Sequence, residues 1–172
     1  GHKHGQRRVF HLFLDALHYE SLGDLSDVDN SNVRLLDLEN FLLFQQRGRE
    51  ARPETDPLVR RAAGEFAKVA GNTSLSLYDR NRAVYDLLRY GVKIKPDVGA
   101  PNETVWLIDW KHPERNRFAV AQEVTVKPGD PKAHEKRPDI VVYVNGIALA
   151  VLELKRSSVS VAEGIRQNLD NQ

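Results

Sequence analysis

Apolar residues recur at helical spacing through the first half of the chain. Residues 7–20 (RRVFHLFLDALHYE) carry one apolar stripe, which predicts an amphipathic helix packed against a core. The polar run at residues 23–32 predicts a loop. Three further helices are predicted at residues 32–48, ending at Gly48, at 56–71, with Pro57 in its first position, and at 75–91, ending at Gly91. The pattern therefore indicates a helical segment over about residues 7–90.

After Gly91 the pattern changes to the two-residue alternation of strands. Asn145-Gly146 separates the last two apolar runs, IVVYV and IALAVL, which predicts a β-hairpin. Ser160 and Glu163 stand in the S-x-x-E relation of a capping box, so a final helix is expected over about 161–172. Strands are predicted at residues 92–96, 104–110, 118–126, 139–144 and 147–155. These elements indicate an α/β (α+β) fold with a helical N-terminal half, in which helices flank a mixed-sheet core at about 92–156.

The composition favours one cytoplasmic domain. The chain has 172 residues and no cysteine, which excludes disulfides and thiolate zinc sites and fits a reducing cytoplasm. No apolar run reaches the roughly 20 residues of a membrane span, so no membrane partner is expected. Residues 1–6 (GHKHGQ) look like a tag remnant or a disordered end, which leaves residues 7–172 as the domain. The formal net charge of +1 does not by itself indicate nucleic-acid binding.

Charged residues stand at the open end of the predicted hairpin. Asp139 leads into it, and Glu153 and Lys155, two residues apart on one face, lead out. With a strict two-residue turn, Asp139 would oppose Leu152 and face away from Glu153. A three-residue loop or a β-bulge would instead place Asp139 opposite Glu153 on one face. A site shared by the two carboxylates therefore requires one of these two departures from a plain hairpin.

Two carboxylates beside apolar strands are costly unless something pairs with them, and a hard divalent cation would do so. Mg²⁺ held by such carboxylates clamps a phosphodiester and lowers the pKa of an attacking water, while an adjacent lysine orients that water. These residue types therefore predict a metal-dependent phosphodiesterase. The alternative from the residues alone is a network of surface ion pairs, because strand ends commonly carry charges and E-x-K occurs by chance in many sequences.

The P-D and E-x-K motifs lie on a hairpin between a basic loop and a capped helix, which resembles the PD-(D/E)xK nuclease superfamily. The resemblance is closer to the N-terminal nuclease domain of the R (motor) subunit of type I restriction endonucleases, over about residues 77–172. It rests on the segments NRAVYDLLRYGV, WLIDW, NRFAVAQEVTV, RPDIVVYVNGIALAVLELK and GIRQNLDNQ. It implies that Asp139, Glu153 and Lys155 are catalytic. It also implies that Asp139, Glu153 and the backbone carbonyl of Leu154 bind the metal.

The resemblance adds further candidates around this site. The family carries a Q-x-x-x-Y motif in the helix after the lysine. Gln167 matches its glutamine, whereas Asn171 stands where the tyrosine would be, so Gln167 remains a candidate contact to DNA or to the site. Many superfamily members also use a polar residue of the first helix. The other accessory candidates, for the metal or for DNA, are His11, Glu123, Arg137 and Arg156.

The family implies a Mg²⁺-dependent endonuclease, with Mn²⁺ able to substitute, that cuts unmodified foreign double-stranded DNA delivered by an ATP-driven translocase. The domain would be a fragment of a longer bacterial or archaeal motor subunit, assembled with modification (methyltransferase) and specificity subunits. No G-x-x-x-x-G-K-[ST] loop is present, so ATP and S-adenosylmethionine are expected to bind only elsewhere in the complex. Two alternatives stay open: a related PD-(D/E)xK repair nuclease or resolvase, and an inactive nuclease-like scaffold for DNA binding or docking.

Overall fold

The computed structural model describes residues 2–25, 32–47, 56–125, 137–154 and 165–166. The chain divides into two compact units, which are considered separately. The sheet unit comprises Gly1–Ser31, Phe118–Tyr143 and Ala148–Gln172, and the helical unit comprises Asn32–Arg117 and Val144–Ile147.

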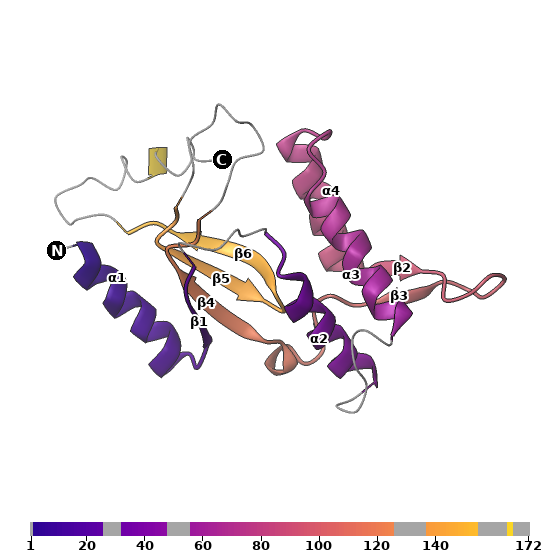
Figure 1. Cartoon of the computed structure of the whole chain (residues 1–172), viewed down its shortest axis with the longest axis horizontal. Helices are drawn as coiled ribbons and strands as arrows, with labels where there is room; N and C mark the ends of the chain where they lie inside the picture. Colours follow the sequence, from indigo (N-terminus) through magenta and orange to yellow (C-terminus); the bar gives the residue numbers. More distant parts are fainter. Residues whose placement is uncertain (1, 26–31, 48–55, 126–136, 155–164, 167–172) are drawn as a thin grey trace. The chain divides into compact units, whose positions relative to one another are not determined.

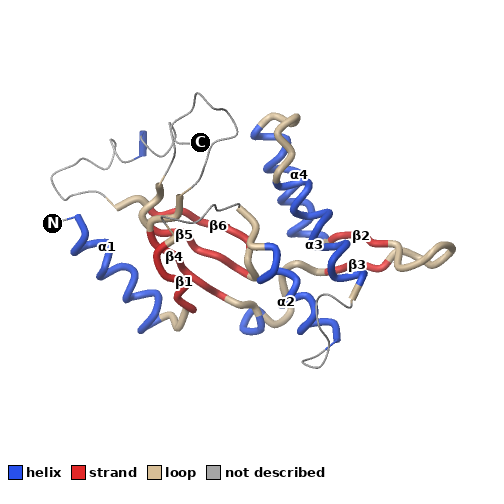
Figure 2. Tube along the Cα trace, in the orientation of Figure 1, coloured by secondary structure: helices blue, strands red, loops and turns tan. Residues whose placement is uncertain are grey.

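A four-stranded sheet with the strand order β1-β4-β5-β6 forms the centre of the sheet unit (Figures 1 and 2). β1 runs parallel to β4. β4 and β5 are antiparallel, because backbone hydrogen bonds join Glu123 to Asp139 at one end of the pair and Arg117 to Asn145 at the other. The strands are β1 (Glu20–Asp24), β4 (Phe118–Gln122), β5 (Ile140–Val144) and β6 (Ile147–Leu152). The mixed sheet predicted from the sequence is thus confirmed.

Helix α1 (His2–His11) continues into a π-helical turn, η1 (Leu12–Ala16), and packs on one face of this sheet. Phe10 is buried there against Val120 of β4 and Ile140 of β5. The amphipathic helix predicted from residue 7 is therefore present but begins earlier. Residues 2–6, which the sequence marks as a tag remnant or a disordered end, form the first turns of α1 in the structure, and Gln6 is only 5% exposed.

The opposite face of the sheet carries a second apolar cluster. Val141 and Tyr143 of β5 lie on it, whereas Ile140 and Val142 lie on the face that α1 covers. Both faces of β5 are therefore packed, which explains why its sequence is an uninterrupted apolar run rather than an alternating one. The second cluster is completed by Leu22, Leu25, Ala119, Ala121, Val124 and Ala148.

Three α-helices and a two-stranded ribbon make up the described part of the helical unit. The Asp56 side chain caps the second of these helices by accepting from the N–H groups of Leu58 and Val59, as its position before Pro57 predicts. Leu42, Val59 and Phe66 belong to the core that the helices share. The elements are α2 (Leu35–Arg47), α3 (Pro57–Ala70), α4 (Leu77–Tyr90), β2 (Val92–Ile94), β3 (Glu103–Val105) and the 3-10 helix η3 (Pro113–Arg115).

Three segments differ from the sequence prediction or escape it. The sequence does not predict β1, because most of its residues are exposed and it forms a strand only by pairing with β4. The strand predicted at 104–110 ends at Val105, beyond which Asp109 and Asn116 bond each other in a turn. The helix predicted at 161–172 lies outside the described residues except for 165–166, which are helical. Among the described helices, none is long and apolar enough to cross a membrane.

Candidate active site

The hairpin between β5 and β6 closes with a two-residue turn. Asn145 and Gly146 have φ values of 54° and 82°, as the central residues of a type I′ turn do. The buried Asn145 side chain donates to the Leu107 carbonyl over 2.9 Å and accepts from the Arg117 N–H over 2.7 Å, all within the helical unit. The three-residue loop considered from the sequence is therefore wrong.

The alternation of side chains along β6 nevertheless slips by one residue before the strand ends. Ala148 packs on the sheet face of Val141, whereas Leu152 and Leu154 pack on the face of Ile140. In a regular strand, residues 148, 152 and 154 would all share one face. A β-bulge between residues 148 and 152 would produce this pattern, so the second of the two departures stays a prediction.

With such a bulge, the two predicted carboxylates would share one face of the hairpin. Glu153 follows the last residue of β6 and lies between Leu152 and Leu154, which both pack against the cluster that α1 covers. Asp139 directly precedes Ile140, the first residue of β5 and a member of the same cluster. Asp139 Oδ2 also accepts a hydrogen bond from the Leu154 N–H over 2.7 Å, so the Asp139 carboxylate lies beside the Glu153–Leu154 peptide.

Asp139 is held at its backbone as well as at its carboxylate. It is 7% exposed, and its carbonyl oxygen accepts from the Glu123 N–H over 3.2 Å and from the Gln6 carboxamide over 3.0 Å. With the Leu154 contact, these bonds tie the residue to α1, to the end of β4 and to the end of β6. The position of the first predicted metal ligand is therefore fixed from three elements of the sheet unit.

Glu123 lies directly beside Asp139. It follows the last residue of β4 and has a φ of 50°, in the left-handed region. Its Oε1 accepts a hydrogen bond from Gln6 Nε2 over 2.9 Å, from the same nitrogen that contacts the Asp139 carbonyl. Of the accessory residues named from the sequence, Glu123 is the one that the described contacts join to Asp139.

The other site residues named from the sequence lie either on the protein surface or outside the described residues. Arg137 is exposed, two residues before Asp139. The His11 side chain is 52% exposed and lies 3.6 Å from Asp15 on the outer side of α1, so no described contact brings it to Asp139. Three candidates lie outside the described residues, namely Lys155, Arg156 and Gln167.

The donor set predicted for the metal consists only of hard oxygen atoms. Within the described residues, no group of three or more His, Cys, Asp or Glu side chains could hold a metal ion. The predicted set is smaller, with two carboxylates, from Asp139 and Glu153, and the Leu154 carbonyl. Mg²⁺ is commonly held by one or two carboxylates and keeps several waters, so this set fits Mg²⁺ in number and in chemistry.

Gln6 is the site neighbour that the sequence interpretation missed. Gln6 lies in the segment that the composition marks as a tag remnant or a disordered end, although it precedes Phe10 by four residues and so extends the apolar stripe of α1 by one turn. That spacing was the available signal, because a residue on this stripe faces the sheet whatever its polarity. The bonds of Gln6 to Glu123 and Asp139 join residues 117 and 133 positions apart, which no local pattern encodes.

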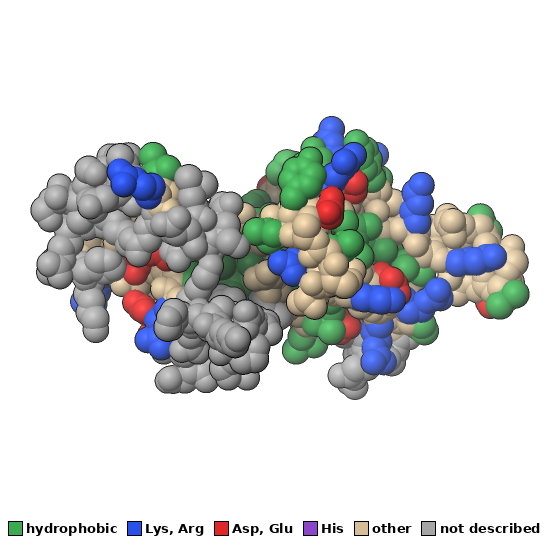
Figure 3. All heavy atoms as spheres, turned by 90° about the horizontal axis from the view of Figure 1, so that it is seen from above, with side chains coloured by type: hydrophobic (Ala, Val, Ile, Leu, Met, Phe, Trp, Pro, Cys, Tyr) green, Lys and Arg blue, Asp and Glu red, His purple; other side chains and the backbone are tan. Residues whose placement is uncertain are grey.

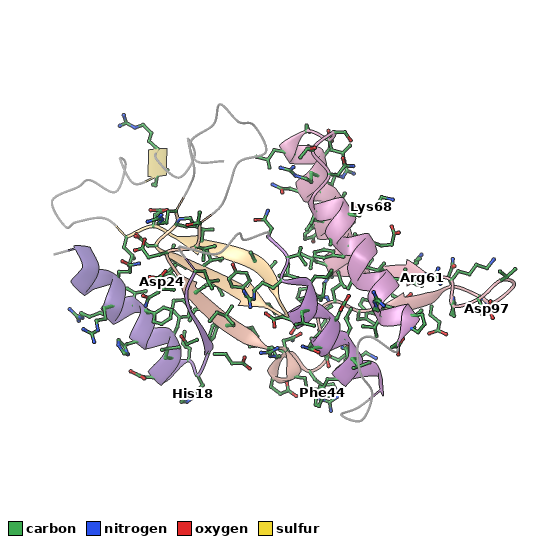
Figure 4. All side chains as sticks on the ribbon, in the orientation of Figure 1. His18, Asp24, Phe44, Arg61, Lys68 and Asp97 are labelled. Carbon is green, nitrogen blue, oxygen red and sulfur yellow. The ribbon has the colours of Figure 1, made fainter. Side chains whose placement is uncertain are left out.

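The helical unit carries an open groove of about 570 Å³ between α3, α4 and β2. Arg61, labelled in Figure 4, lines it and donates to the Lys95 carbonyl over 2.8 Å. Glu65 and Asp86 line it as well, so its charge is mixed. Figure 3 likewise shows basic and acidic side chains interspersed on the visible face of this unit. The groove therefore has no single sign of charge that would select an anionic ligand.

Comparison with known proteins identifies the family of the chain. Residues 37–172 match the family described as the type I restriction enzyme R protein N terminus. The chain is 31% identical over 133 residues to the type I restriction enzyme HindI endonuclease subunit of Haemophilus influenzae, covering 73% of this chain and 12% of that protein. It is 35% identical over 78 residues to a protein of Methanocaldococcus jannaschii provisionally named type I restriction enzyme MjaIXP endonuclease subunit, covering 44% of this chain and 8% of that protein.

Because the family match spans more than half of the sequence, the chain belongs to the family of type I restriction enzyme R protein N termini. The resemblance inferred from the P-D and E-x-K motifs is thus confirmed. The matched region includes the whole β5–β6 hairpin and the predicted site residues from Glu123 onward. The chain spans only 12% of the length of the Haemophilus relative.

Proposed function

We propose that this chain is the Mg²⁺-dependent endonuclease domain of a type I restriction enzyme and hydrolyses phosphodiester bonds of double-stranded DNA. The observation that carries the proposal is the hydrogen bond from the Leu154 N–H to Asp139 Oδ2, which joins the P-D motif to the E-x-K motif. Family membership supplies the class of reaction, and the oxygen donor set suits a hard divalent cation.

In this proposal Asp139, Glu153 and the Leu154 carbonyl hold Mg²⁺, and Mn²⁺ can substitute. The cation, when bound, polarises the scissile phosphate and lowers the pKa of a bound water. Lys155 orients the attacking water and offsets negative charge that develops on the phosphate oxygens. Arg137 and Arg156 contact the DNA backbone beside the site, and Gln167 contacts the backbone or the site from the following helix. Phosphate contacts of this kind position DNA without reading its sequence.

The chain represents a small share of its relatives, which are named as endonuclease subunits of type I restriction enzymes. We therefore assign recognition and delivery of unmodified foreign DNA to other parts of the assembly. ATP-driven translocation belongs to the remainder of the motor subunit. Methylation with S-adenosylmethionine and target recognition belong to the modification and specificity subunits. The near-neutral charge of this chain, +1, is consistent with a domain that cuts DNA held by its partners.

The test is cleavage by the reconstituted restriction complex with Asp139→Asn or Lys155→Ala in this domain. We expect cleavage of unmodified DNA to fall by about 10²-fold or more, because each change removes a group that acts on the charged transition state. ATP hydrolysis and translocation should remain at their wild-type rates, since neither variant touches a nucleotide site. Cleavage that persists in both variants would refute the assignment of these residues.

A further inference from the structure

Gln6 has a buried side chain that bonds a polar neighbour of the proposed metal site. It is 5% exposed, and its Nε2 donates to Glu123 Oε1 over 2.9 Å and to the Asp139 carbonyl over 3.0 Å. A glutamine carboxamide has one donor nitrogen with two hydrogens and one acceptor oxygen. Both partners are acceptors, so the nitrogen must face them, and both of its hydrogens are used. The orientation of Gln6 is therefore determined by its surroundings.

The contact with Glu123 coincides with a strained backbone. Glu123 has a φ of 50°, which is uncommon for a residue with a long side chain and strains the backbone. Two bonds hold this conformation, one from the Glu123 N–H to the Asp139 carbonyl and one from Gln6 to the carboxylate. Strain of this kind persists only where the surroundings hold it, and it is concentrated at functional sites.

The two acceptors lie close together because they share one donor. Glu123 Oε1 and the Asp139 carbonyl oxygen are each within 3.0 Å of Gln6 Nε2. The Glu123 carboxylate is therefore held near the backbone carbonyl of Asp139, whose carboxylate is the first proposed metal ligand. Because the described residues contain no cluster of three acidic, His or Cys side chains suited to a metal, Glu123 would act through water rather than as a direct ligand.

From these contacts we infer that Gln6 is a positioning residue for the metal site and that Glu123, which it orients, strengthens cation binding through an ordered water. The inference rests on the proposed function. A neutral donor suits this task, because it fixes the direction of the Glu123 carboxylate without offsetting its negative charge. Outer-shell partners of metal ligands typically change metal affinity by about 10–100-fold when they are removed.

The experiment is titration calorimetry of Mn²⁺ into the chain and its variants. Gln6→Met keeps the length of the side chain but removes the donor, and Glu123→Gln keeps an oxygen acceptor for Gln6 but removes the charge. We expect each variant to weaken Mn²⁺ binding by about 10-fold. The double variant should bind Mn²⁺ with the same affinity as the single variant that binds it more weakly, because Gln6 acts through Glu123. Gln45→Met, at a half-buried glutamine on α2, is the matched control and should keep the wild-type affinity.

A purely structural role predicts a different pattern. If Gln6 only fastens α1 to the sheet, Gln6→Met will lower the unfolding temperature and leave the Mn²⁺ affinity unchanged, which overturns the inference. Should Gln6→Met fail to fold, the decision falls to Glu123→Gln, and wild-type affinity in that variant overturns the inference as well.

Asp139→Asn separates this inference from the proposed function. Suppose that the wild-type protein binds Mn²⁺ and that Asp139→Asn abolishes this binding. If Gln6→Met and Glu123→Gln then bind Mn²⁺ as the wild type does, the proposed metal site is supported and only the role of Gln6 fails. If wild-type protein gives no saturable heat with Mn²⁺, the proposed metal site and the role of Gln6 both fail.

Discussion

The Leu154 N–H donates a hydrogen bond to Asp139 Oδ2 over 2.7 Å. This contact joins two residues that are 15 positions apart and lie at the open end of the β5–β6 hairpin. It places the Asp139 carboxylate beside the peptide that links Glu153 to Leu154. The P-D and E-x-K segments are therefore joined by a charge-assisted bond, which is stronger than one between neutral groups.

Asp139→Ala should destabilise the chain even without a metal. It removes the acceptor of the Leu154 N–H and leaves that donor in a partly buried position, which costs about 1–3 kcal/mol in the free energy of unfolding. Asp139→Asn keeps an oxygen acceptor and should cost less. Urea unfolding of both variants, with chelator present, measures the difference. Equal stability of the two variants would show that the hydrogen bond to Leu154 contributes little.

Gly146→Ala should lower the free energy of unfolding more than most single substitutions in this chain. The φ of Gly146 is 82°, and an added Cβ would lie 2.7 Å from the Arg34 carbonyl oxygen and 2.8 Å from the Leu38 nitrogen. Because backbone atoms cannot move aside cheaply, we expect a loss above about 3 kcal/mol. Gly99→Ala is the matched control, since Gly99 also has a positive φ, 86°, but open space around it. It should lose only about 1 kcal/mol. Similar losses in thermal unfolding at both positions would contradict the steric argument.

Asn145→Ala tests the buried turn. The side chain bonds the Leu107 carbonyl, the Asn116 side chain and the Arg117 N–H, and the residue is fully buried. Its removal leaves these groups unsatisfied, so we expect a loss of roughly 2–4 kcal/mol in the free energy of unfolding. Asn72→Ala, at an asparagine whose bonds to Ser74 are exposed, should cost well under half as much. Comparable losses in denaturant unfolding would refute the importance of burial.

Asp109 should make the stability of the chain depend on pH in acid. The hydrogen bond from the His112 backbone N–H holds the pKa of the Asp109 carboxyl below its ordinary value of 3.8. A lowered pKa in the folded state stabilises the fold above the ordinary value, and that contribution is lost as the pH falls through the lowered pKa. The stability advantage over Asp109→Asn should therefore be constant from about pH 7 to pH 5 and shrink below about pH 4. A pH-independent difference in urea unfolding would contradict this cause.

The parts of the fold predictable from the sequence are those with local signals. The Asp56 cap before Pro57 and the terminal Gly91 mark helices α3 and α4, and the Asn145-Gly146 pair marks the hairpin. Each signal acts within a few residues, where propensity and capping decide the structure.

The parts that escaped prediction depend on distant partners. β1 exists because β4 pairs with it, and its exposed ESLGD sequence shows no alternation. The position of the Gln6 side chain depends on its hydrogen bonds to Glu123 and Asp139, which lie more than 100 residues away in the sequence. The slip along β6 is visible only from the cluster that each side chain joins. The candidate site residues could therefore be named from motif chemistry, whereas the contacts of Asp139 with Gln6, Glu123 and Leu154 could not.

The position of the cation tests the central claim most directly. Crystals of the chain soaked in Mn²⁺ and measured at the manganese absorption edge would locate the ion by its anomalous scattering. We predict a peak within about 2.0–2.6 Å of carboxylate oxygens of Asp139 and Glu153 and of the Leu154 carbonyl oxygen. The peak should be absent from Asp139→Asn crystals. An ion bound elsewhere, with these three groups uncoordinated, would contradict the proposed metal centre.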